Sequence, residues 1–105
     1  MKIVKVKYKA NKATITEVHS SIGAFMKNYS DKGYHNLVSF LGVAQLYYRL
    51  TKTLLITKNS YVISIPVLEA CAYCYFYEKG KMPVLDAMSE IAVRELYTLI
   101  DKQVK

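Results

Sequence analysis

The sequence predicts a single α+β domain over residues 1–105, with a four-stranded antiparallel sheet built from two hairpins and helices packed on one face of that sheet. The chain has 105 residues, of which 52% are hydrophobic and 22% are charged. This length and composition fit one hydrophobic core and argue against a disordered chain. Apolar residues recur with period two in some stretches and at three- and four-residue spacing in others, which predicts strands and helices. The predicted order is ββααββαα.

The first eighteen residues form the first predicted hairpin. Residues 4–9 alternate strictly between apolar side chains and lysines, which is the pattern of a half-buried strand. A polar turn at 10–12 leads into the β-branched run 13–18, whose composition favours a second strand. We therefore expect both strands to pair as sequence neighbours.

Two predicted helices follow this hairpin. Ser20 or Ser21 supplies the N-cap of the first, and Gly33 ends it in a left-handed conformation. Asn36 caps the second helix, whose apolar residues share one face as far as Leu50. Both helices are therefore expected to pack on the sheet through one apolar side.

The second predicted hairpin joins two β-branched or aromatic runs. These runs are 51–57 and 61–65, and the polar residues 58–60 separate them as a turn. A lone hairpin cannot bury its apolar side, so two hairpins are expected to share one four-stranded sheet.

Residues 70–77 fit two interpretations. Their composition and the alternation of their tyrosines are typical of a fifth strand. Pro66 at a helix N1 position and Gly80 at C′ frame the same segment as a helix, and we predict the helix. Pro83 opens the last predicted helix.

The predicted order also suggests an internal duplication, with halves 1–50 and 51–105. The two polar turns lie 48 residues apart, and the helix stops that contain glycine lie 47 apart. Few of the equivalent positions are identical, so chance agreement between two ordinary units stays open.

The charge of the chain is strongly asymmetric. Fifteen Lys and Arg residues against eight Asp and Glu residues give a net charge of +7, and residues 1–66 hold ten of the basic but only two of the acidic ones. This excess favours a polyanionic partner, and lysine suits phosphate contacts better than base-specific recognition. We expect a small non-enzymatic binding protein with DNA or RNA as the leading ligand. The expected contact residues are Lys5, Lys7, Lys9, Lys12, Arg49, Lys52 and Lys58.

Other interpretations of these features stay open. A lysine row is also typical of a solvated strand face that protects a sheet edge from aggregation, and it would suit an acidic protein partner. Ten tyrosines without any tryptophan are compatible with a Tyr-rich core, a subunit interface or a base-stacking platform. The alternative function is therefore a protein-interaction module or a structural protein that uses a Tyr-rich or apolar surface. We also expect a homodimer.

No motif in the chain indicates catalysis, a metal site or a cofactor. Cys71 and Cys74 form a Cys-x-x-Cys, but the predicted helix begins five residues before Cys71, away from the dipole that activates redox cysteines. Buried thiols, a disulfide, and a zinc site shared across a dimer all remain open for this pair. His19 and His35 are too few to complete a zinc site within one chain.

In composition the chain resembles small proteins of viruses that infect thermophilic archaea. The resemblance rests on the preference for Lys over Arg, the ten tyrosines, the frequent Ile and Val, and segments such as 2–9. It implies a viral protein, often oligomeric and often without enzymatic activity, that acts on host or viral partners in the host cytoplasm. It also makes a disulfide between Cys71 and Cys74 less surprising, because intracellular proteins of hyperthermophiles can be disulfide-rich. The chain shows neither a secretory signal nor a transmembrane run, which also predicts a cytoplasmic location.

Overall fold

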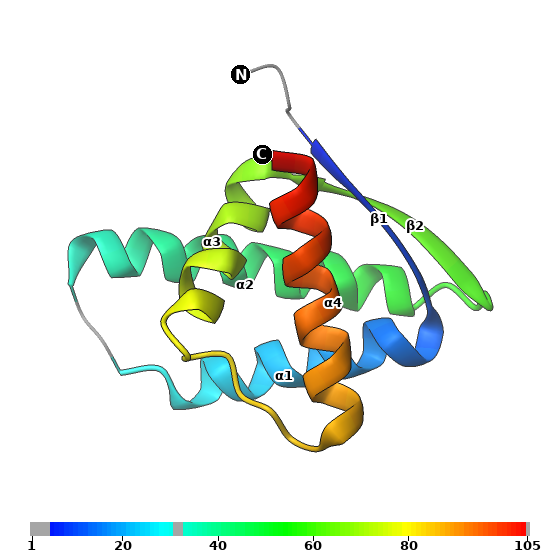
Figure 1. Cartoon of the computed structure of the whole chain (residues 1–105), viewed down its shortest axis with the longest axis horizontal. Coiled ribbons are helices and arrows are strands. Elements are labelled where there is room, and N and C mark those ends of the chain that lie inside the picture. The colour runs from blue at the N-terminus through cyan, green and yellow to red at the C-terminus, as the bar shows by residue number, and fades with distance from the viewer. Residues whose placement is uncertain (1–4, 31–32, 105) are drawn as a thin grey trace.

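A computed structural model of the chain describes residues 5–30 and 33–104. The elements follow in the order βααβαα, with the two strands side by side on one side of the helices (Figure 1). The elements are β1 (Lys5–Asn11), α1 (Lys12–Asn28), α2 (Tyr34–Leu54), β2 (Ser60–Pro66), α3 (Val67–Glu78) and α4 (Ala87–Val104).

The sheet is a two-stranded antiparallel ribbon of β1 and β2, not the predicted four-stranded sheet. Its inner face pairs Val6 with Ile65 and Tyr8 with Ile63, and all four side chains are buried. The alternation predicted for residues 4–9 and the strand predicted at 61–65 are confirmed, except that residue 4 lies outside the described part of the chain. The strands that pair belong to different halves of the chain, so neither sits in a local hairpin.

The prediction of a second strand at 13–18 is wrong, because α1 begins directly after β1. The side chain of Asn11 accepts a hydrogen bond of 2.8 Å from the backbone N–H of Thr14 and so caps the helix. Ile15, Val18, Ile22 and Phe25 then recur at helical spacing and are buried. This apolar stripe outweighs the β-propensity of the run. The serines predicted as caps lie in the middle of the helix.

The strand predicted at 51–57 is also wrong, because α2 continues past Leu50 to Leu54. The hydroxyl groups of Thr51 and Thr53 donate hydrogen bonds of 2.9 Å to the carbonyl oxygens of Tyr47 and Arg49, one turn earlier. β-branched threonines are thus accommodated in the last turns of the helix. At the other end, the N-cap of α2 is Gly33 and not Asn36.

The helix predicted between Pro66 and Gly80 is confirmed as α3. Gly80 follows the C-cap with a φ of 68°, the left-handed conformation that glycine adopts at low cost. Pro66 stands at the N-cap, one position earlier than predicted. The last helix, α4, begins at Ala87 instead of Pro83, behind reciprocal hydrogen bonds between Asp86 and Ser89.

Each half of the chain therefore runs strand, helix, helix. The offset of 48 residues between the predicted turns does not relate the two strands, because it places Lys5 on Thr53 in α2. The residues 10–12 form the junction between β1 and α1 instead of a hairpin turn. The duplication into halves 1–50 and 51–105 and the single-domain organisation stay predictions.

The core lies between the inner face of the ribbon and the four helices. Tyr73 is fully buried there, and its hydroxyl donates a hydrogen bond of 2.9 Å to the carbonyl oxygen of Val93. Tyr8 and Tyr61 also belong to the core, whereas Tyr48 is exposed on α2. Several of the tyrosines are thus core residues.

Candidate nucleic-acid interface

The outer face of β1 carries a row of three exposed lysines, which we call the lysine ridge: Lys5, Lys7 and Lys9. Every second residue of a strand points to the same face, so neighbouring ridge side chains start about 7 Å apart. Across the ribbon they lie opposite Pro66, Ser64 and Val62. Neither strand contains an acidic residue, and Glu95 of α4 lines a groove together with Lys9.

The backbone under the ridge is held from both sides. On its inner side Val6 and Tyr8 anchor β1 in the core. On its outer edge the N–H of Lys7 donates a 3.0 Å hydrogen bond to Oε1 of Gln103, and Nε2 of Gln103 donates one of 2.8 Å to the Lys7 carbonyl. The amide of Gln103 thus occupies the edge of β1 as the backbone of a third strand would. The lysines therefore project from a fixed base.

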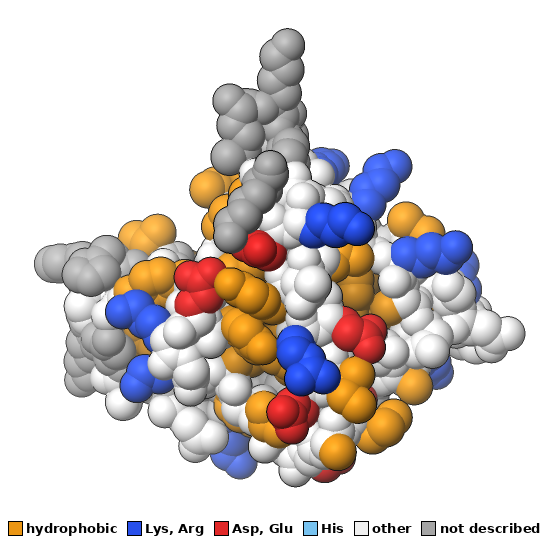
Figure 2. Space-filling view, in the orientation of Figure 1, with side chains coloured by type: hydrophobic (Ala, Val, Ile, Leu, Met, Phe, Trp, Pro, Cys, Tyr) orange, Lys and Arg blue, Asp and Glu red, His pale blue; other side chains and the backbone are white. Residues whose placement is uncertain are grey.

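Two more predicted contact residues lie at the far end of the ribbon. The backbone N–H of Lys12 donates a 3.3 Å hydrogen bond to the carbonyl oxygen of Asn59, which brings Lys12 close to Lys58. Both side chains are exposed. Figure 2 shows several Lys and Arg side chains at the upper right of the molecule, over the ribbon, and others among the acidic side chains over the helices.

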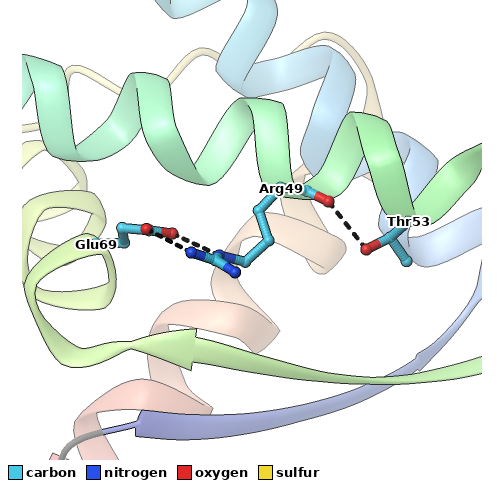
Figure 3. Close-up of polar contacts among 3 residues, drawn as sticks. All are labelled: Arg49, Thr53 and Glu69. Atoms are coloured by element: carbon cyan, nitrogen blue, oxygen red, sulfur yellow. Dashed lines mark hydrogen bonds and ion pairs between the residues drawn. The ribbon is translucent and has the colours of Figure 1, made fainter.

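Arg49 is engaged elsewhere. Its Nε and one terminal nitrogen each donate a 2.9 Å hydrogen bond to Glu69 in the first turn of α3, which is a bidentate ion pair (Figure 3). This hydrogen bonding raises the pKa of the Arg49 guanidinium. Glu69 is nearly buried, so removing Arg49 would leave a buried charge without its partner. Lys52 lines the same side of α2 and is exposed. Arg49 also lines a groove with Val62 and Ser64 of β2, but its guanidinium is bound to Glu69.

Neither β1 nor β2 exposes an aromatic side chain on its outer face. Burial, with a smaller contribution from Glu95, raises the pKa of the Tyr8 hydroxyl well above its usual value. Tyr61 uses its hydroxyl to donate to the carbonyl oxygen of Ile56 and to accept from the N–H of Lys58. Both strand tyrosines therefore have structural roles, and neither offers a surface for base stacking.

The remaining chemical candidates do not assemble into a site. Cys71 is exposed and Cys74 half-buried on α3, and both are free. Burial, followed by nearby Cys71, raises the pKa of the Cys74 thiol to about 12, so this thiol stays protonated at neutral pH. His19 stacks on Tyr47 and lies 2.7 Å from the Thr51 hydroxyl, and burial lowers its pKa. The side chain of His35 is not among those that the structure describes.

Within residues 5–30 and 33–104, no cluster of three or more His, Cys, Asp or Glu side chains could hold a metal ion. The same ranges contain no helix with the length and apolar character needed to cross a membrane. The chain matches no protein-family model, no curated protein and no solved structure. The function must therefore be argued from this structure itself.

Sequence reasoning missed two residues that shape this region. Gln103 lies 96 residues from Lys7, and nothing in the sequence around it marks an edge-covering amide. Glu69 carries a weak signal, because an acidic residue in a first turn after a proline is typical of a helix start. That signal does not reveal Arg49 as its partner.

Proposed function

We propose that the protein is a non-enzymatic nucleic-acid-binding protein that contacts the phosphates of a duplex through the lysine ridge. One observation carries this proposal: three lysines project in register from a fixed strand whose exposed face holds no acidic side chain. Lysine contacts phosphate as a point charge and releases counterions without reading the bases. Because binding of single strands relies on aromatic stacking and this face has none, a duplex is the better ligand.

The main alternative is that the lysines only protect a strand edge from aggregation. On β1 the amide of Gln103 takes over that role at Lys7, where it covers both backbone groups. Strand β2, whose outer edge has no such cover from the described residues, carries no lysine at all. Ligand binding therefore accounts for the position of the lysines better than edge protection does.

The first experiment measures binding to labelled duplex DNA, duplex RNA and single strands at about 50 and 200 mM salt. With three to five phosphate contacts, the affinity should fall about 40- to 500-fold over this range. The ridge variant Lys5→Ala/Lys7→Ala/Lys9→Ala should lose most of the affinity and reduce the slope of log K against log salt by about 2.7.

The matched control is Lys27→Ala/Lys79→Ala/Lys81→Ala, which removes the same charge from exposed positions away from the ribbon. It should retain most of the affinity. Absence of binding at about 50 mM salt, or an equal loss in both triple variants, would refute the ridge as the binding surface.

A protein-interaction function is favoured by a different observation. Several large hydrophobic side chains are exposed on neighbouring parts of α2 and α3, among them Val38, Leu41 and Leu68, which line one groove. Exposed apolar patches of this kind mark interaction sites in soluble proteins. Such an interface would be insensitive to salt, in contrast to the ridge.

A further inference from the structure

Helix α2 has two hydrophobic faces, and only one of them is used within the chain. Val43, Leu46 and Leu50 are fully buried against the core. The opposite face carries a second set of residues at alternating three- and four-residue spacing, all of them exposed. This set, which we call the outer stripe, consists of Val38, Leu41, Gln45, Tyr48 and Lys52, continued by Leu55 at the C-cap of the helix.

The outer stripe has the spacing of a coiled-coil seam. Positions a and d of a heptad alternate in steps of three and four, and their side chains pack into a facing helix. The side chains of Val38 and Leu55 are 70% and 80% exposed, and those of Leu41 and Tyr48 are 53% and 60% exposed. The outer face of a surface helix normally carries polar residues. Within the described residues, no helix packs against this face.

We propose that the outer stripe binds the same stripe of a second copy, with the two α2 helices antiparallel about a two-fold axis. The stripe is complementary to itself in this arrangement. Val38 lies opposite the partner's Leu55, Leu41 opposite the aliphatic stem of the partner's Lys52, and Gln45 opposite the partner's Tyr48. Apolar residues thus meet apolar atoms, while the central amide and hydroxyl can hydrogen-bond.

The charge of the stripe permits a second copy on this face. Two chains of net charge +7 repel each other, so they can associate only where the surface is close to neutral. Lys52 is the single charged residue of the stripe, and the two copies of it would lie about 16 Å apart along antiparallel helices, beyond the screening length of about 8 Å. The adjacent Arg49 is already paired with Glu69 (Figure 3).

The neighbouring helix widens the surface. Gly42 of α2 packs so closely on α3 that an added Cβ would lie 2.7 Å from the Cβ of Ala72. This close approach brings Leu68, whose side chain is 81% exposed, beside Val38 and Leu41. A helix docked on the stripe would therefore also contact Leu68. The surface does not include the lysine ridge, and the proposal does not depend on nucleic-acid binding.

The test is the molar mass of the full chain by sedimentation, from about 1 to 100 µM. We expect twice the 12.0 kDa mass of the chain at the upper end of this concentration range. Tyr48→Lys places two like charges next to the two-fold axis and should weaken association at least about 100-fold. The control Met88→Lys adds the same charge at a side chain of similar exposure, 62%, on α4, and should stay dimeric.

Cross-linking tests the arrangement itself, in chains that carry Cys71→Ser and Cys74→Ser. Under mild oxidation, a mixture of Gln45→Cys and Tyr48→Cys chains should form mixed disulfides. Val38→Cys alone should not cross-link, because the antiparallel arrangement separates its two copies by about 25 Å. Circular dichroism of each variant verifies that it folds. A monomer at about 100 µM, a Tyr48→Lys variant that still dimerises, or rapid cross-linking of Val38→Cys would overturn the proposal.

Discussion

The two strands of the ribbon share one inner design and differ on their outer sides. Both bury every second side chain, and Val6 of β1 lies opposite Ile65 of β2 in the core. On the outer face β1 presents lysines, whereas β2 presents Ser60, Val62 and Ser64, which are uncharged. The edge of β1 is covered by Gln103, but the edge of β2 faces a groove shared with α2. The difference shows that the buried inner residues are alike in both strands, whereas the outer residues can differ because they are not needed to fill the core.

The inner face should dominate stability. Ile65→Ala removes a fully buried side chain and should lower the free energy of unfolding by about 2–5 kcal/mol, measured by urea denaturation. Val62→Ala truncates an exposed side chain on the outer face of the same strand and should change the free energy of unfolding by less than about 0.5 kcal/mol. Equal effects at both positions would mean that the two faces of β2 are not distinguished by burial.

Uncovering the edge of β1 should lower the free energy of unfolding by an amount between the effects of Ile65→Ala and Val62→Ala. Gln103→Ala removes two hydrogen bonds to Lys7 and should cost about 1–2 kcal/mol of unfolding free energy, because the freed backbone groups can still bind water. Hydrogen exchange at the Lys7 amide should become faster. Thr98→Ala, at another exposed position of α4, is the control and should leave that amide protected.

The open edge of β2 should affect association more than stability. Val62→Lys should change the unfolding free energy by less than about 0.5 kcal/mol, yet reduce aggregation on heating, as followed by light scattering. The reciprocal variant Lys7→Val should not increase aggregation, because Gln103 still covers that edge. An increase of aggregation in Lys7→Val would assign edge protection to the lysines after all.

The sequence predicted those features that local periodicity encodes. Both strands of the ribbon and helix α3 follow from alternation or from the Pro66 and Gly80 boundaries. The α+β class is correct, but the number of strands is not. At 13–18 the β-branched composition suggested a strand, whereas the helical spacing of buried Ile15 and Val18 decided the structure.

Long-range contacts account for the rest. β1 pairs with β2 and not with a sequence neighbour. This pairing depends on which apolar surface of the packed helices remains for the strands to cover. In the candidate interface, the lysines of β1 were visible from sequence as an alternating row. The engagement of Arg49 by Glu69 and of Lys7 by Gln103 joins residues 20 and 96 positions apart, and neither pair leaves a local pattern.

The pairing of strands from opposite halves also has a consequence for synthesis on the ribosome. Until β2 has emerged, β1 has no neighbour in the sheet, and its apolar side, with Val6 and Tyr8, cannot be buried in the ribbon. The ribbon therefore forms late, because its two strands are separated in the sequence by α1 and α2 and must come together over that distance. Closing such a long segment slows folding relative to a local hairpin. Charged side chains on an unpaired strand disfavour its pairing with other chains, so the alternating lysines of β1 suit a strand that waits for its partner.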